Sequence, residues 1–220
     1  MNKILSFVRL DFITVKPYLT LRNLAIFVGV ALIMIFTNNS GAAGATGVLM
    51  AFATLYASYP FIIGEKSNID ILYTTLSIKR NTVVSGRYIF ALTLDLFAGL
   101  FTFLLSFILL VAMQKGFSAI ESMAIILIFF LVFSIIQAVQ LPLYFKLGYT
   151  KAKFLAYLPF IVLPLAIMAF SNAFGNVFLG LLEWLSANPL LTALVGAGIW
   201  LAIMAVSYKI SLSFYRKRDF

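Results

Sequence analysis

The chain has 220 residues and a net charge of +9; 63% of its residues are apolar, 10% are charged, and its mean hydropathy is +1.08. This composition excludes a soluble domain and predicts an all-α, polytopic membrane protein that forms a single membrane domain over residues 1–220. The chain contains neither cysteine nor histidine, so it has no thiolate metal site and lacks the commonest general base.

Residues 1–22 mix apolar and basic side chains. The apolar ones form a stripe at helical spacing: Ile4, Val8, Phe12 and Val15. This pattern predicts a helix that lies in the membrane interface and ends near Pro17. A frayed cytoplasmic tail is the alternative.

Apolar segments that predict six transmembrane helices follow at 23–37, 46–64, 88–113, 118–141, 154–170 and 189–208. If the N-terminus is cytoplasmic, every lysine and arginine except Lys115 falls on the cytoplasmic side. The excess of basic residues on the inner side therefore places both termini in the cytoplasm.

Residues 176–186 lie between the last two predicted spans and are too short to cross the membrane. Their apolar side chains predict a short helix in the outer leaflet, with Trp184 at the interface. An irregular outer loop is the alternative.

Residues 65–87 form the longest internal stretch that cannot lie in a bilayer. An apolar stripe at helical spacing runs through it: Ile69, Leu72, Tyr73 and Leu76. Charged side chains are arranged to suit a helix dipole, with acidic ones early and basic ones mainly late: Glu65, Lys66, Asp70, Lys79, Arg80 and Arg87. We interpret the segment as the surface through which a cytoplasmic partner drives the membrane subunit. The alternative is a solvated loop with a surface helix.

Asp95 is the one charged residue well inside a predicted span. It follows Arg87 by eight residues, about 12 Å along a helix, and Gln137 and Gln140 lie at comparable depth on the next span. These amides are candidate hydrogen-bond partners for the carboxylate, which should face protein or water rather than lipid. The group is either a coupling or translocation residue or a structural clamp between helices.

Motifs for catalysis are absent from the sequence. It contains no Gly-x-x-x-x-Gly-Lys-Ser/Thr loop, no His-Glu-x-x-His and no Gly-x-Ser-x-Gly. The chain therefore needs a separate ATPase if its work is driven by ATP, and we expect no metal or cofactor in the chain itself.

The cytoplasmic segment and its flanks resemble the ABC-2 type permeases, the membrane subunits of one class of ATP-binding-cassette exporters. The resemblance lies in Tyr59-Pro60-Phe61, Gly64-Glu65-Lys66, Ile69-Asp70, Thr74–Arg80 and Val83–Tyr88. Ser77 stands where the family usually has a proline. Length and predicted topology agree over the whole chain.

This resemblance implies that residues 65–80 form the coupling helix that docks into a cytoplasmic ATPase, and that residues 177–185 form an outer re-entrant helix. It also implies a dimer of permeases with two ATPases, which bind the ATP and Mg²⁺, in a bacterial cytoplasmic membrane. Similar half-size permeases belong to exporters of phenol-soluble modulins and to bacitracin-type resistance systems, so the expected cargo is an amphipathic or hydrophobic peptide. The rival functions are a membrane immunity or assembly protein without transport and a lipid-processing membrane enzyme.

The charge asymmetry generates a test of topology. Single cysteines at Ser40 and Ser186 should react with a membrane-impermeant maleimide on intact cells, whereas cysteines at Ser67 and Ser213 should react only after lysis. Labelling of the Ser67→Cys variant from outside would show that the predicted orientation is wrong.

Overall fold

The computed structural model of the chain describes residues 3–37, 42–67, 69–75, 78–112, 118–175, 180 and 187–218. Every regular element in these ranges is helical. The short elements at one end are α1 (Lys3–Val15), the 3-10 turn η1 (Lys16–Tyr18), α4 (Tyr59–Lys66) and α5 (Ile69–Thr75). The long helices are α2 (Leu21–Thr37), α3 (Ala42–Ala57), α6 (Arg80–Ala112), α7 (Ala119–Leu147), α8 (Tyr149–Ala173) and α10 (Pro189–Arg216).

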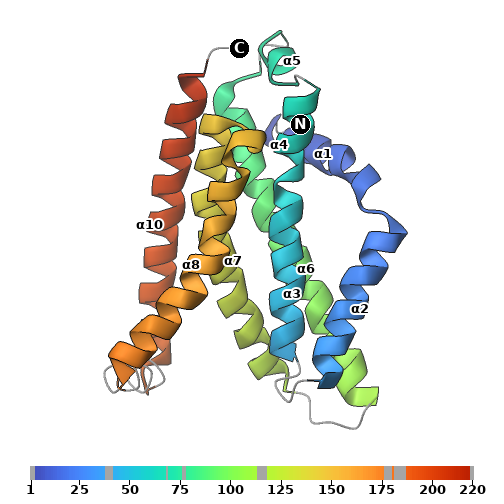
Figure 1. Cartoon of the computed structure of the whole chain (residues 1–220), viewed down its shortest axis with the longest axis vertical. Coiled ribbons are helices and arrows are strands. Elements are labelled where there is room, and N and C mark those ends of the chain that lie inside the picture. The colour runs from blue at the N-terminus through green and yellow to red at the C-terminus, as the bar shows by residue number, and fades with distance from the viewer. Residues whose placement is uncertain are drawn as a thin grey trace.

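Figure 1 shows the long helices running between two ends of a bundle, with both labelled termini and α5 at the same end. Basic side chains gather at helix termini there, and we call it the basic end: Lys3, Lys79, Arg80, Lys146 and Arg216. Together the termini and the charges fit the predicted orientation, in which this end faces the cytoplasm.

Within the part of the chain that the structure describes, four helical segments are long and apolar enough to cross a membrane: Ala43–Lys66, Arg80–Val111, Ala119–Leu147 and Leu191–Arg216. A fifth is counted if α1 with η1 and α2, which are bent by 86°, form one broken span. The chain is therefore an all-α, multi-pass membrane protein. Six spans remain a prediction, since α2 has only 17 residues and α8 carries Lys151 and Lys153 near its start.

The helices extend beyond the apolar segments from which they were predicted. The third predicted span begins at residue 88, but α6 begins at Arg80. Val83 and Val84 explain the extension, because they are buried in the core at the basic end and hold the extra turns in place. The predicted cytoplasmic segment 65–87 is consequently divided among the end of α4, α5 and the first turns of α6.

The N-terminal helix α1 is held against α6 rather than frayed. Its buried face consists of Phe7, Val8, Asp11 and Val15, so the predicted stripe lies partly against protein and not only against lipid. Leu5 and Ile13 remain exposed and are available to the membrane interface. The predicted outer helix of 176–186 falls outside the described residues, apart from Gly180.

Polar contacts attach α10 to its neighbours along its length. The Tyr88 hydroxyl lies 2.6 Å from that of Ser207 and 2.8 Å from that of Ser211. Nearer the far end, the Trp200 indole donates to the Ser134 hydroxyl at 2.7 Å. At the basic end Arg80 donates to the carbonyls of Tyr215 and Arg216.

Close packing of α1 on α6 depends on Gly86. A Cβ atom at this position would overlap the ring of Phe7. We expect Gly86→Ala to lower the free energy of unfolding by about 1–3 kcal/mol, measured as a fall in the melting temperature of the detergent-solubilised protein. Gly29→Ala is the control, because nothing lies within 4 Å of the added methyl group. Equal melting temperatures for the two variants would show that α1 is not packed in this way.

Candidate functional site: the Arg87 cluster at the basic end

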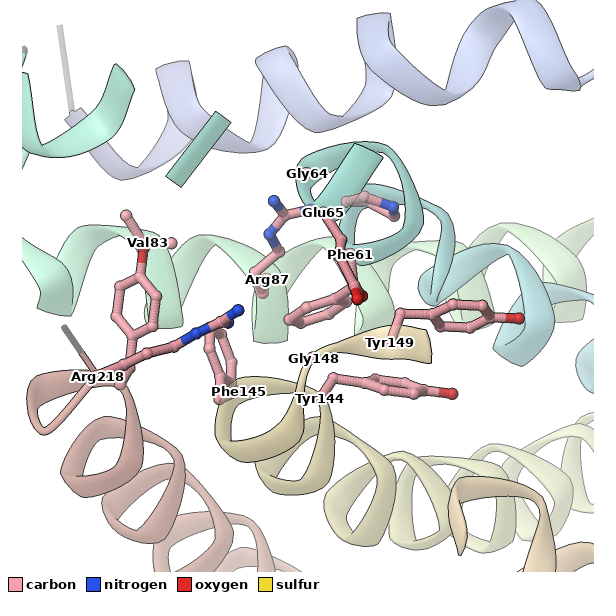
Figure 2. Close-up of a pocket in the computed structure, with 12 residues that line it drawn as sticks. Phe61, Gly64, Glu65, Val83, Arg87, Tyr144, Phe145, Gly148, Tyr149 and Arg218 are labelled. Carbon is pink, nitrogen blue, oxygen red and sulfur yellow. The ribbon is translucent and has the colours of Figure 1, made fainter. Parts of the chain in front are cut away.

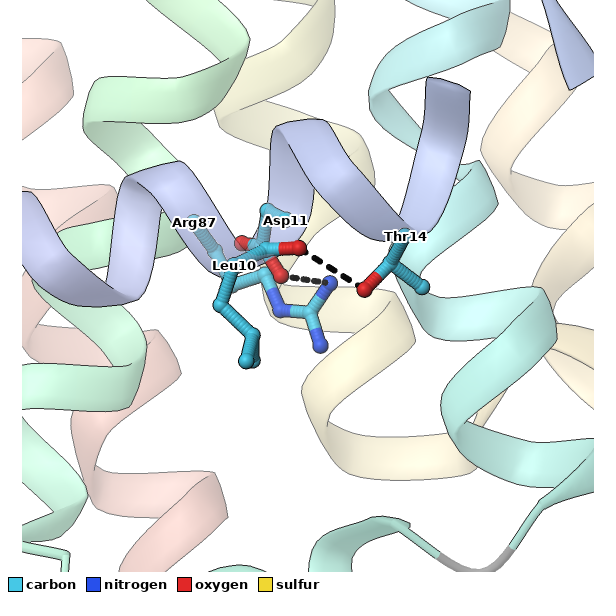
Figure 3. Close-up of polar contacts among 4 residues, drawn as sticks. All are labelled: Leu10, Asp11, Thr14 and Arg87. Carbon is cyan, nitrogen blue, oxygen red and sulfur yellow. Dashed lines mark hydrogen bonds and ion pairs between the residues drawn. The ribbon is translucent and has the colours of Figure 1, made fainter. Parts of the chain in front are cut away.

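Arg87 is a buried cation at the centre of the basic end. The residue is only 4% exposed, and its Nη1 atom lies 3.1 Å from Oδ1 of Asp11 on α1. Figure 3 shows this ion pair beneath α1, where the Thr14 hydroxyl donates to the Leu10 carbonyl at 2.8 Å. The pair joins α1 to α6.

Aromatic rings complete the surroundings of the guanidinium. Its central carbon lies 4.9 Å from the ring centre of Phe61 on α4 and 5.7 Å from that of Phe7 on α1. Phe7 in turn meets Tyr73 of α5 edge to face, with ring centres 5.2 Å apart. Cation–π contacts of a desolvated arginine are stabilising, so Arg87 holds α1 and α4 against α6, and α5 joins them through the contact of Tyr73 with Phe7. We call Phe7, Asp11, Phe61, Tyr73 and Arg87 the Arg87 cluster.

Burial has a larger effect on the pKa of Asp11 than the neighbouring guanidinium has. Burial raises the pKa of Asp11 from 3.8 to about 6, against a smaller lowering by Arg87. The folded protein therefore binds this proton more tightly than the unfolded chain, and this group alone raises the free energy of unfolding as the pH falls from about 6 to 3.8. The pair thus fixes the position of α1 without contributing much net stability at neutral pH.

Glu65 connects α4 to the turn between α7 and α8. Its Oε2 accepts a hydrogen bond of 3.0 Å from the backbone N–H of Thr150, in the first turn of α8. A carboxylate there complements the positive end of the helix dipole. Gly148 permits the approach: its φ is +75°, and a Cβ atom would lie 3.2 Å from the same oxygen.

A narrow cleft lies inside these contacts. Figure 2 shows the labelled residues around it, which come from α4, α6, the end of α7, the start of α8 and the segment just after α10. The enclosed space is about 20 Å³, enough for about one water molecule. The cleft is too small for a substrate, and among the described residues no group of three Asp, Glu, His or Cys side chains is placed to hold a metal ion.

The predicted coupling residues divide between the interior and the surface. Tyr73 is 5% exposed and Ile69 packs against the same core, so neither presents its side chain to a partner. Leu72 is 52% exposed, and Lys66 and Lys79 are exposed as well. The predicted stripe thus packs partly inward in the structure, where Tyr73 meets the ring of Phe7, and its role in coupling stays a prediction. Leu76 and the side chain of Asp70 lie outside what the structure describes.

Asp95 and Gln137 lie together in the membrane-embedded part of the bundle. Gln137 Nε2 donates to Asp95 Oδ1 at 3.0 Å and lies 3.4 Å from the Thr54 hydroxyl, which connects α3, α6 and α7. Gln140, also expected near Asp95, instead donates to the Ala156 carbonyl of α8 at 2.8 Å.

The pairing of Asp11 with Arg87 was not predicted from the sequence. A signal for it existed, because Asp11 lies three residues after Val8 and four before Val15, on the apolar stripe itself. A charge on a buried stripe requires a partner of opposite charge. The position of that partner, 76 residues further along the chain, required the fold.

These features define a multi-pass α-helical membrane protein whose basic end is held together by an ion pair and aromatic contacts around Arg87. A family model described as ABC-2 family transporter protein matches residues 6–216, and the chain therefore belongs to the ABC-2 family. It is a permease subunit of an ABC transporter, and such permeases typically work with an ATPase partner. No curated protein and no solved structure matches the chain.

The ion pair generates an asymmetric prediction. Asp11→Leu leaves a buried guanidinium that cannot lose its proton and should lower the free energy of unfolding by about 3–5 kcal/mol. Arg87→Met should be less harmful, because the pKa of Asp11 is already about 6 and the carboxyl can become neutral. Melting temperatures in detergent at pH 7 measure both.

The double variant Asp11→Leu/Arg87→Met is the control for this comparison. It should be more stable than Asp11→Leu alone, because it removes the unpaired charge. Additive losses in the double variant would show that the two side chains do not interact.

Proposed function

We propose that the protein is the permease subunit of an ABC exporter and forms half of a translocation pathway for an amphipathic or hydrophobic peptide. The supporting observation is the Arg87 cluster, a set of buried contacts at the predicted cytoplasmic end of a permease whose sequence has no Gly-x-x-x-x-Gly-Lys-Ser/Thr loop. The proposed energy source is a separate ATPase that binds ATP and Mg²⁺.

The proposed docking surface is the exposed side of α4 and α5. Leu72 offers an apolar anchor there, and Lys66 and Lys79 offer basic groups on either side of it in the sequence. The inward side of the same segment is attached to α1 and α6 through Tyr73 and the Arg87 cluster, and to α8 through Glu65. Movement of the ATPase would thus reach the long helices through packed contacts.

Peptide cargo is proposed from the resemblance to half-size permeases of phenol-soluble modulin and bacitracin-type systems. The same resemblance also implies a dimer of permeases. Apolar side chains of α8 that the monomer leaves exposed are available to lipid or to such a partner: Phe154, Ile161 and Met168. The test of cargo uses inside-out vesicles that contain both subunits. Labelled amphipathic peptides should accumulate inside these vesicles when ATP is added outside.

The docking proposal is tested at Leu72, with the ATPase that co-purifies with wild-type permease from its native cells. Leu72→Asp should release this ATPase and abolish its stimulation by the permease, because burying an unpaired carboxylate in the contact is unfavourable. Leu72→Met is the matched control, since it retains an apolar side chain of similar size and should retain the ATPase.

Pull-down from detergent and the ATPase rate give the two readouts. Retention of the ATPase by Leu72→Asp would overturn docking at α5. The turn between α7 and α8 is then the next surface to test, by Lys151→Glu.

A further inference from the structure

An apolar groove lies between α6 and α7, in the half of the bundle away from the basic end. Its volume is about 590 Å³, within the range of about 300–1,000 Å³ that is usual for small-molecule sites. Large apolar side chains form its walls: Leu96, Leu100, Phe103, Met123, Leu127 and Phe130. Leu96 and Leu100 are more than half exposed, so the groove opens sideways toward the lipid.

Tight packing closes the floor of the groove. A Cβ atom at Gly99 would lie 2.8 Å from Ile126 of α7 and 3.1 Å from Met50 of α3. The helices therefore touch at Gly99 and leave space beside it. The small side chain of Ala124 keeps the α7 wall open.

Asp95 lies in this floor and is only half satisfied. The residue is 0% exposed, and its Oδ1 accepts the hydrogen bond from Gln137. Among the residues that the structure describes, Oδ2 has no hydrogen-bond partner. The described residues that line the groove include no basic side chain, and Arg87 lies about 12 Å away along α6 in its own ion pair. A buried carboxylate oxygen without a partner is unfavourable.

We propose that the groove is a lateral binding site for a hydrophobic organic amine, whose ammonium group donates to Asp95 Oδ2 while its apolar part lies along α6 and α7. An ammonium group would favour the ionised form of the buried carboxyl and would supply its missing hydrogen bond, and this pairing selects the ligand. A lipid acyl chain would fill the apolar walls and leave Oδ2 unpaired. The headgroup of an outer-leaflet phospholipid does not fit either, because Asp95 precedes the outer end of α6 at Ala112 by 17 residues, about 25 Å. The site does not depend on the ATPase or on the export of peptides.

The experiment uses the full-length permease in phosphatidylcholine nanodiscs, without ATPase or nucleotide. Radiolabelled dodecylamine is the probe and dodecanol its uncharged match, and binding to empty nanodiscs is subtracted. Dodecylamine should bind saturably to the wild type, and dodecanol about tenfold more weakly. Equal affinities for the amine and the alcohol, or no saturable binding above empty nanodiscs, would overturn the proposal.

Two variants and one control locate the site. Asp95→Asn keeps an oxygen that accepts from Gln137 but removes the charge, and it should weaken dodecylamine binding about tenfold without affecting dodecanol. Ala124→Phe fills the groove without touching the carboxylate and should weaken both probes. Ala197→Phe adds the same bulk to an exposed alanine on α10 and should change neither.

The two variants keep the proposal falsifiable even if one of them fails to fold. Unchanged dodecylamine binding in a folded Asp95→Asn or Ala124→Phe protein would overturn it. If Leu72→Asp retained the ATPase, the conclusion from dodecylamine binding would not change, because no ATPase takes part in the binding experiment.

Discussion

The basic end depends on the burial of one guanidinium. Arginine stays protonated at any pH that the protein meets, so a buried Arg87 requires compensating groups on every side. Asp11 supplies the charge, and Phe61 and Phe7 supply the faces of aromatic rings. Because these groups come from α1 and α4, satisfying the arginine fixes a crosswise helix and a short helix against α6.

The same contacts determine how a force at this end can spread. Three separate contacts leave the α4–α5 region and the start of α6: Tyr73 to Phe7 of α1, Glu65 to the first turn of α8, and Arg80 to the last carbonyls of α10. Each contact ends on a helix terminus or a buried ring rather than on a loop. Packed interiors deform little, so in the proposed coupling these three contacts would pass a displacement of this region to α1, α8 and α10.

Hydropathy and charge predicted the membrane class, the basic end and the depth of Asp95 because these properties depend on composition along the chain. The contact between Asp95 and Gln137 was within reach of the same reasoning, since depth alone makes them neighbours on adjacent spans. The rotation of each helix about its own axis could not be predicted in this way. Gln140 lies only three residues from Gln137, yet it faces Ala156 of α8. Tyr73 turned inward for a similar reason, because helical spacing identifies a stripe but not which surface covers it.

The two buried ionisable groups of the long helices differ mainly in the space beside them, because Arg87 Nη1 and Asp95 Oδ2 both lack a hydrogen-bond partner among the described residues. Arg87 is enclosed by Asp11 and by two rings, and the cleft beside it holds about 20 Å³. Asp95 has one amide on one oxygen, and it borders a groove of about 590 Å³. A clamp between helices would need no such space, since Gln137 already joins α6 to α7 and lies near Thr54 of α3. The free oxygen and the adjoining volume are therefore best explained together, by a ligand that carries its own proton donor.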